Sequence, residues 1–256
     1  MACLLPLQAG GLWAGMGSGK TRVALEMARE RGVRRLLVLC PKAVIGQWER
    51  QAARWWPRLR VLALGKGTFS FRQEAIAMFG DGLVIVNYDI APKLALQKWL
   101  NGSPAAAMLV MDEIQKLKKP GGKRSRAVAA LTARWRLGLS GTPLAHSPLD
   151  AYAVYRALDA SVFGTSYTKF KQNYTMPCNW GKHDGMEVGR GGSLQPYRFT
   201  NLDDLNRRMM SIAYQVATRD VLDLPPETDV VREVTLEPDV ARLYRKLERD
   251  LTAEIR

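Results

Sequence analysis

The segment from Leu12 to Thr21 constrains the fold of this chain more than any other part of the sequence. A short apolar run leads there into a glycine-rich turn that ends in a lysine and a threonine, and a helix is predicted directly afterwards, from Arg22 to Arg29. Glycines let the backbone N–H groups of such a turn converge on phosphate oxygens, and the start of the helix adds the positive end of its dipole. The segment therefore predicts a phosphate-binding loop between a strand and a helix.

The residue types of this loop predict ATP and Mg²⁺ as its ligands. Lys20 is expected to reach the β- and γ-phosphates, and Thr21 to offer its hydroxyl to Mg²⁺. The general loop pattern has glycine where Ala14 stands, whereas the variant A-x-x-G-x-G-K-T, which occurs in helicase-type ATPases, fits without a mismatch. The alternative is a glycine-rich turn that serves packing alone. The predicted nucleotide-binding residues are Gly17, Ser18, Gly19, Lys20 and Thr21.

Strand and helix patterns alternate over the first 140 residues. Strands are predicted at 34–40, 59–64, 83–86, 105–111 and 136–139, and helices at 44–56, 71–79, 92–100 and 124–132. Such alternation indicates an α/β fold, in which helices flank a parallel sheet and the ligand site lies at the carboxyl ends of the strands. The glycine loop, Asp112-Glu113 and Ser140-Gly141-Thr142-Pro143 all fall at such ends.

The alternation stops at about Ser147, and the rest of the chain reads as an appendage and not as more sheet. Helices are predicted at 149–158, 166–174, 202–212 and 239–255, a glycine-rich loop at 176–199 and a strand at 230–236. This pattern predicts three parts. They are a nucleotide-binding lobe at 1–158, a helical insertion at 159–224, and a strand with a helix at 225–256.

The composition favours a polyanionic partner. Among 256 residues, Lys and Arg outnumber Asp and Glu by 38 to 24, which gives a formal charge of +14. This excess favours nucleic acid over an anionic membrane, because no basic amphipathic anchor stands out. A solvated basic surface is the alternative. No run reaches transmembrane length and the start does not resemble a signal peptide, so the cytoplasm is the predicted location.

The cysteines and histidines predict no protein-made metal cluster. Cys3, Cys40 and Cys178 are scattered, and His146 and His183 do not complete a ligand spacing. The pattern is typical of a reduced protein without structural metal.

A second nucleotide motif is expected if the first is genuine. Met108 to Met111 read as a buried strand that delivers Asp112 and Glu113 to its end. Asp112 is predicted to hold Mg²⁺, and Glu113 to polarise the attacking water, because phosphoryl transfer depends mainly on positioning and charge neutralisation. Lys20, Asp112 and Glu113 are therefore the predicted catalytic residues.

A one-sided basic stretch follows this acidic pair, with no acidic residue before Asp150. Its members are Lys116, Lys118, Lys119, Lys123, Arg124, Arg126, Arg134 and Arg136. Part of the stretch is predicted to contact a nucleic-acid backbone, while a solvated face and packing of Arg134 near Trp135 are the alternatives. Ser140 to Pro143 is either a simple turn or a relay that passes the nucleotide state towards a bound strand.

Taken together, these motifs resemble the first RecA-like lobe of Swi/Snf-related superfamily-two helicase-like ATPases, which are ATP-driven translocases on double-stranded DNA. The compactness of the match favours a bacterial or phage member. The matching segments are Met16 to Thr21, Pro41 with Gln47-Trp48-Glu49, Asn87-Tyr88, Asp112 to Lys118, Leu137 to Leu144 with Asp150, Phe163-Gly164, Phe170 to Tyr174, and Leu222 to Pro225.

The resemblance also assigns roles outside the nucleotide loop. It implies that Gln115, Ser140 and Thr142 couple the nucleotide state to DNA. The tryptophans Trp48, Trp55 and Trp56 are expected in the core, because duplex translocases grip the backbone instead of splayed bases. Six residues are assigned to the DNA side. Lys42, Gln47, Asn87 and Tyr88 lie in segments that border the DNA in relatives, and Lys116 and Lys118 belong to the basic stretch.

Three departures from the family pattern change the expected activity. Gln115 stands where the family usually has histidine, which predicts altered coupling. Gln8 lies only 12 residues before Lys20, which is too near for the adenine-contacting segment of relatives. The Q-x-x-G-R-x-x-R run of a second lobe, which supplies arginine fingers, is absent. Because such a finger is worth about 10³–10⁵ in rate, slow hydrolysis is expected unless a second lobe joins.

Two other classes of protein stay open from the sequence. One is a non-catalytic nucleic-acid-binding module that keeps the nucleotide fold as a scaffold. The other is an unrelated P-loop enzyme such as a kinase or recombinase, against which Ser140 to Leu144 and the predicted insertion argue.

Overall fold

A computed structural model describes residues 3–144, 146–178, 183–188, 194–217 and 234–254. The chain divides into two units, residues 1–222 and 223–256. The first unit contains every strand found in the described residues.

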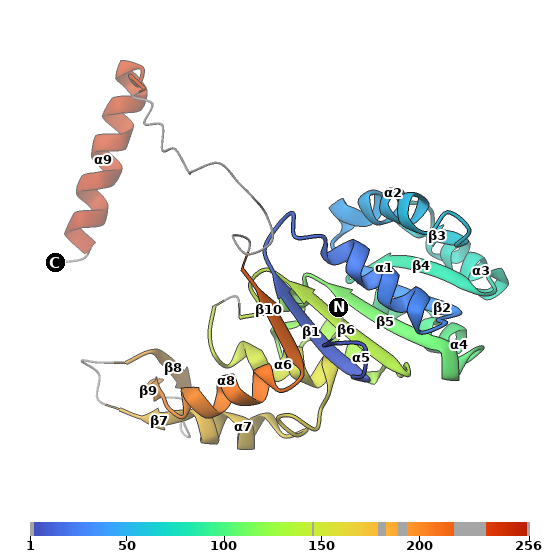
Figure 1. The fold of residues 1–256 in the computed structure, drawn as a ribbon. Coiled ribbons are helices and arrows are strands. Elements are labelled where there is room, and N and C mark those ends of the chain that lie inside the picture. Colours follow the sequence, from blue (N-terminus) through green and yellow to red (C-terminus); the bar gives the residue numbers. More distant parts are fainter. Residues whose placement is uncertain (1–2, 145, 179–182, 189–193, 218–233, 255–256) are drawn as a thin grey trace. The chain divides into compact units, whose positions relative to one another are not determined.

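The first unit is built on a seven-stranded parallel sheet (Figure 1). The order across the sheet is β10-β1-β6-β5-β2-β4-β3. Leu37 of β2 pairs with Leu109 of β5 on one side and with Val84 of β4 on the other. The strands are β1 (Ala9–Ala14), β2 (Arg35–Cys40), β3 (Val61–Ala63), β4 (Gly82–Asn87), β5 (Ala107–Asp112), β6 (Trp135–Ser140) and β10 (Ala213–Val216). The predicted α/β parallel sheet is confirmed.

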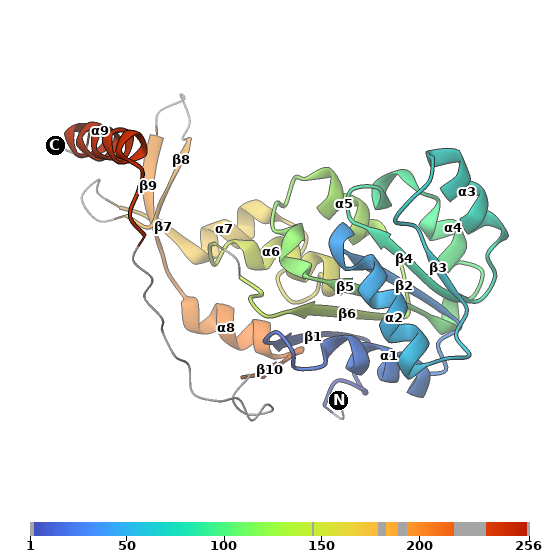
Figure 2. The same ribbon diagram turned by 90° about the horizontal axis from the view of Figure 1, so that it is seen from above.

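Helices cover both faces of this sheet, which explains why the central strands are apolar throughout instead of alternating. α1 and α2 pack on one face, and α3, α4, α5 and α6 pack on the other (Figure 2). These helices are α1 (Lys20–Glu30), α2 (Ile45–Trp55), α3 (Phe69–Met78), α4 (Leu96–Leu100), α5 (Lys123–Ala130) and α6 (Asp150–Leu158). Short 3₁₀ turns lie at Lys42–Val44, Ala91–Lys93, Pro104–Ala106 and Ile114–Leu117.

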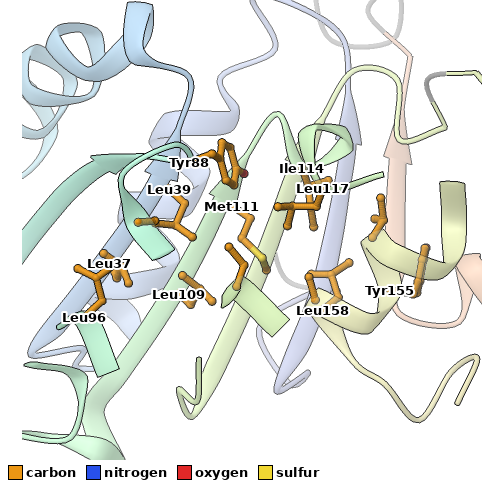
Figure 3. Close-up of a cluster of buried hydrophobic side chains, with 14 of the residues drawn as sticks. Leu37, Leu39, Tyr88, Leu96, Leu109, Met111, Ile114, Leu117, Tyr155 and Leu158 are labelled. Carbon is orange, nitrogen blue, oxygen red and sulfur yellow. The ribbon is translucent and has the colours of Figure 1, made fainter. Parts of the chain in front are cut away.

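The larger core lies between the sheet and the second group of helices (Figure 3). Leu39, Leu109 and Met111 from the strands are completely buried there. Leu96 of α4 and Leu158 of α6 close the layer from the helix side. At about 25 cal/mol per Å² of apolar surface, such full burial stabilises the packing of these helices on the sheet.

Beyond α6 the structure corrects two expectations. The segment predicted as a loop forms a three-stranded antiparallel sheet, in the order β7-β9-β8. Its strands are short, so their sequence signal is weak. The elements here are α7 (Tyr167–Tyr174), β7 (Thr175–Pro177), β8 (Gly185–Val188), β9 (Leu194–Phe199) and α8 (Leu202–Met210). The predicted helices around α7 and α8 are confirmed.

The second correction is that the chain returns to the main sheet after α8. β10 adds a seventh strand beside β1, with Gly11 opposite Ala213. The Tyr155 hydroxyl donates to the buried Met209 carbonyl at 2.6 Å and fixes the end of α8 before this strand. Residues 147–217 therefore include part of the sheet, contrary to the prediction of an appendage alone.

The second unit consists of α9 (Pro238–Glu254) within its described residues. The predicted helix is confirmed up to residue 254. Of the predicted strand at 230–236, residues 230–233 lie outside the described residues, and 234–236 are not a strand. The predicted closing segment at Leu222 to Pro225 also lies outside the described residues. Among the described helices, none is long and apolar enough to cross a membrane.

Candidate nucleotide site and basic face

The glycine loop has the backbone geometry of an anion site. Gly17 and Gly19 adopt φ angles of 76° and 81°, which glycine reaches without steric cost. α1 then begins at Lys20. The first turn of α1, all of it described, has no acidic residue and no side-chain cap. Its N–H groups and the positive end of its dipole are therefore available to an anion.

Lys20 stands at the centre of this loop. Its ammonium group donates to the carbonyls of Ala14 and Gly15 at 2.8 Å each. The Ser18 hydroxyl donates to the same Gly15 carbonyl at 2.7 Å, which closes the turn. A phosphate that displaced the two carbonyls would gain a charge-assisted hydrogen bond from Lys20.

The acidic pair lies where β5 ends. Asp112 accepts the backbone N–H of Glu113 at 3.1 Å on Oδ1 and the indole N–H of Trp48 at 2.8 Å on Oδ2. Burial raises the pKa of Asp112, while the Trp48 hydrogen bond and the charge of Lys20 act in the opposite direction. A half-buried carboxylate of this kind is stabilised by a cation brought beside it. Glu113 has a φ of 51°, so the chain turns sharply there.

The loop and the acidic pair line one cavity of about 570 Å³. Its lining residues are Met16, Gly17, Gly19, Lys20, Thr21, Arg22, Val44, Gln47, Trp48, Gln51, Trp55, Asp112 and Glu113. Backbone donors and a lysine on one wall, with carboxylates on another, suit a triphosphate that carries its own cation. No group of three His, Cys, Asp or Glu side chains that could hold a metal occurs in the described ranges. Mg²⁺ is usually bound through a few protein oxygens together with substrate phosphates, and Thr21, Asp112 and Glu113 offer oxygens on the wall of this cavity.

A chain of hydrogen bonds leads away from Glu113 to the end of β6. The Gln115 amide nitrogen donates to the Glu113 carboxylate, and the fully buried Ser140 hydroxyl donates to Gln115 Oε1 at 2.8 Å. The backbone N–H of Thr142 donates to the same hydroxyl at 2.9 Å. The structure thus connects the three predicted coupling residues to the predicted catalytic carboxylate.

The residues predicted to border DNA separate into three environments. Lys42 and Lys116 are exposed, and Lys118 is half-buried. Gln47 is exposed and lines the cavity between the glycine loop and the acidic pair.

Asn87 and Tyr88, which belong to a segment that borders the DNA in relatives, have side chains that are buried in the lobe. Asn87 is 6% exposed, and its side-chain oxygen accepts the N–H groups of Asp89 and Ile90. Tyr88 is 3% exposed and donates its hydroxyl to the main-chain oxygen of Asp112 at 2.8 Å. Both side chains are therefore committed to internal hydrogen bonds.

The residues of the basic stretch fall into two groups, two arginines that pack against the lobe and lysines that line cavities on its surface. Arg136 is half-buried and donates to the Leu131 and Val128 carbonyls, and burial lowers its pKa to about 10. Arg134 stacks over Trp135 with 4.6 Å to the ring centroid. Both arginines therefore make packing contacts. For Arg134 this was the alternative prediction from the sequence.

The remaining lysines surround two cavities of about 620 and 490 Å³. Lys118, Lys119, Gly122 and His146 line both cavities, and Lys116 and Lys123 line the second. This basic face lies beside the Gln115 end of the hydrogen-bonded chain, because Gln115 also lines the second cavity.

Two contacts at the cavity between the glycine loop and the acidic pair were not predicted from the sequence. Trp48 is buried as expected, but its indole N–H also donates a hydrogen bond to Asp112, which lies 64 positions later in the sequence. Trp55 is partly buried and packs against the core, and it also lines the cavity with the Arg22 guanidinium 4.0 Å from its ring centroid. A tryptophan in an amphipathic helix carries no sequence signal that separates packing from such contacts.

Comparison with known proteins identifies the family. The sequence model of the SNF2-related domain matches residues 8–256. The chain belongs to the SNF2-related domain family. The predicted resemblance is thereby confirmed, and the chain is an SNF2-family ATPase domain, homologous to DNA-dependent translocases and remodelers, that covers only part of the ATPase core.

Individual relatives agree with this assignment. The TATA-binding protein-associated factor mot1 of Schizosaccharomyces pombe is 24% identical over 86% of this chain and 11% of its own length. The putative ATP-dependent helicase/translocase YwqA of Bacillus subtilis is 25% identical over 92% of this chain and 24% of its own. This chain therefore spans at most about a quarter of these relatives.

Solved structures confirm the RecA-like fold. The Sulfolobus solfataricus SWI2/SNF2 ATPase core in complex with dsDNA matches with a TM-score of 0.63 at 21% identity, over all of this chain and 51% of that one. A second structure, of the Sulfolobus solfataricus SWI2/SNF2 ATPase core domain, gives a TM-score of 0.60 at 22% identity, over 99% of this chain and 49% of that one. At this identity the likeness concerns the fold.

Proposed function

We propose that this chain binds ATP with Mg²⁺ in the cavity between the glycine loop and the acidic pair, as the nucleotide-binding lobe of a DNA-dependent translocase. The observation that carries the proposal is that one cavity is lined by Lys20, Thr21, Asp112 and Glu113 together. Membership of an ATPase family supports the same interpretation.

Each residue of the site has its own proposed role. Gly17, Ser18 and Gly19 shape the loop, and Lys20 neutralises phosphate charge. Thr21 and Asp112 hold Mg²⁺, which supplies charge neutralisation when bound. Glu113 orients the water that attacks, and its hydrogen bond from Gln115 fixes the direction in which its carboxylate points.

Double-stranded DNA is the proposed partner of the basic face. Lys116, Lys118, Lys119 and Lys123 supply the positive charge that phosphates require. One of the similar solved structures is a complex with dsDNA, and relatives include the DNA excision repair protein ERCC-6 of Mus musculus, 22% identical over 66% of this chain and 11% of its own. Gln115, Ser140 and Thr142 connect this face to Glu113.

Hydrolysis at a useful rate is proposed to require a second RecA-like lobe. Within the described residues, the cations that line the cavity are Lys20 and Arg22, and both belong to the first turn of α1. An arginine finger from a second lobe would add charge from the opposite side and is worth about 10³–10⁵ in rate. A cytoplasmic setting in a bacterial or phage-infected cell is part of the proposal, supported by the Bacillus relative.

Calorimetric titration with a non-hydrolysable ATP analogue and Mg²⁺ tests the nucleotide site. Lys20→Ala is expected to weaken binding at least tenfold, because it removes the charge-assisted bonds to phosphate, about 1.5–3 kcal/mol. Lys98→Ala is the matched control, since Lys98 lines a separate cavity with Trp99. Equal affinities of the two variants would refute the proposed site.

The DNA side is tested by filter binding of a radiolabelled duplex. Replacement of Lys116, Lys118 and Lys119 by alanine is expected to weaken binding and to flatten its salt dependence by up to about three units of slope. Lys20→Ala should leave DNA binding largely intact. A chain that binds DNA but no nucleotide, even as wild type, would instead support the alternative of a non-catalytic binding module.

The need for a second lobe is tested by mixing. Addition of a separately expressed second lobe from an SNF2-family relative should raise DNA-stimulated phosphate release well above that of the chain alone. No gain in phosphate release with any candidate lobe would count against the proposed need for a second lobe.

A further inference from the structure

Asp112 is held in place from two segments outside the glycine loop. The Trp48 indole N–H donates to its Oδ2 atom, and the Tyr88 hydroxyl donates to its main-chain oxygen, each at 2.8 Å. Trp48 is 1% exposed and Tyr88 is 3% exposed. The side chain and the peptide of the same residue are thus both fixed by buried donors.

The Trp48 contact removes a rotational freedom that a carboxylate otherwise has. Rotation about the terminal torsion of aspartate is broad and roughly two-fold. In this structure Oδ1 accepts the Glu113 N–H and Oδ2 accepts the Trp48 N–H, so one orientation satisfies both donors. The buried indole N–H needs an acceptor as well, which makes the preference mutual.

The two donors come from segments that follow neighbouring strands. Trp48 lies on α2, which starts just after β2, and β2 pairs directly with β5. Tyr88 directly follows β4 and belongs to the buried cluster of Figure 3, together with Met111. Both contacts therefore depend on the order of strands in the sheet, and the two donors belong to the core clusters on its opposite faces.

We propose that Trp48 and Tyr88 are positioning residues for the divalent cation of the nucleotide site. Trp48 sets the orientation of the Asp112 carboxylate, and Tyr88 sets the position of the peptide that carries it. Residues that orient metal ligands in this way commonly change metal affinity by about 10–100-fold when replaced. The inference rests on the proposed function, since the cation arrives with the nucleotide.

Trp48→Phe in the full chain tests the positioning role. The substitution keeps an aromatic ring in the core, although a smaller one, and removes the N–H donor. Mg²⁺ is titrated into protein that is saturated with a fluorescent, non-hydrolysable ATP analogue. The Mg²⁺ concentration at half-maximal signal is expected to rise about tenfold. Affinity for the analogue in EDTA is expected to stay within about twofold, which a general loss of structure would not allow.

Trp99→Phe is the matched control. Trp99 is also a buried tryptophan, 4% exposed, and its N–H donates to the Phe79 and Gly80 carbonyls away from Asp112. It should leave the Mg²⁺ titration unchanged. Tyr88→Phe should shift the Mg²⁺ titration in the same direction as Trp48→Phe. If circular dichroism shows that Trp48→Phe does not fold, the Tyr88→Phe titration tests the positioning role in its place.

The outcomes separate this inference from the proposed function. A wild-type titration with tighter analogue binding in Mg²⁺, together with an unchanged Trp48→Phe, overturns the positioning role and leaves the nucleotide site standing. An equal loss in Trp99→Phe overturns it as well, since the effect would then be general. If the wild-type chain binds no analogue, the proposed function fails and the positioning role fails with it.

Discussion

The hydrogen-bonded chain between Glu113 and Thr142 predicts a measurable energetic coupling between Gln115 and Ser140. The Ser140 hydroxyl is fully buried and donates to Gln115 Oε1 at 2.8 Å. Gln115→Ala takes away this acceptor and leaves a buried hydroxyl proton unpaired, which costs about 1–3 kcal/mol. The free energy of unfolding is expected to fall by that amount.

Ser140→Ala removes the other half of the same bond at a smaller cost. The Thr142 N–H loses its acceptor, but Thr142 is exposed and water can replace it. Half-buried Gln115 loses one hydrogen bond, worth about 0.5–1.5 kcal/mol. In the double variant no buried hydroxyl is left unpaired, so its loss should be about 1 kcal/mol less than the sum of the single losses.

Urea unfolding of the four proteins, followed by circular dichroism, measures this coupling from the midpoints, provided that the m-values agree. Thr68→Ala supplies a control pair with Gln115→Ala. Thr68 caps α3 through a hydrogen bond from the Phe71 N–H and has no part in the chain from Glu113. The control pair should be additive within about 0.3–0.5 kcal/mol. The same additivity for Gln115 and Ser140 would refute the reasoning.

The remaining predictions concern Gly138, Tyr155 and Cys40. A Cβ on Gly138 would lie 2.8 Å from an isoleucine methyl in the turn after β5, so Gly138→Ala should lower the free energy of unfolding by about 1–3 kcal/mol in urea denaturation, and no loss would mean that the core yields there. Tyr155→Phe leaves the buried Met209 carbonyl without its donor and should cost about 1–3 kcal/mol by the same measurement, with faster hydrogen exchange in β10 as the distinguishing sign. Burial raises the pKa of Cys40 from 9.0 to about 12, so mass spectrometry after iodoacetamide treatment at about pH 8.5 should find exposed Cys3 alkylated and Cys40 intact. Because the folded pKa of Cys40 is the higher one, its contribution to stability should be complete below pH 9 and disappear as the pH rises towards 12; a stability that is flat over that range would contradict this assignment.

Much of the lobe was predictable because its signals are local. The apolar runs that became β2, β4, β5 and β6 are continuous, since both faces of a central parallel strand are buried. The glycine loop was predictable for a similar reason, because Gly17 and Gly19 supply φ angles that other residues avoid. Placement of the loop and Asp112 at one edge then follows from the parallel topology.

The errors concern elements whose stability comes from partners. β10 has four residues, none of them fully buried, and it exists because β1 offers an unpaired edge and the Tyr155 contact fixes the end of α8. The strands β7, β8 and β9 stabilise one another as an antiparallel sheet and carry little pattern singly. The burial of Asn87 and Tyr88 is likewise a property of the folded lobe that no local pattern predicts.

The sequence by itself determined the α/β class, the glycine-rich loop before α1 and the acidic pair at the end of β5, because periodicity and backbone preference depend on neighbouring residues. Only the tertiary structure decided what each of these groups touches. Trp48 meets Asp112 across 64 positions and Ser140 meets Gln115 across 25. Such pairs form because β2 and β6 both lie beside β5, and strand order is fixed by the packing of helices on the two faces and not by any short stretch of sequence.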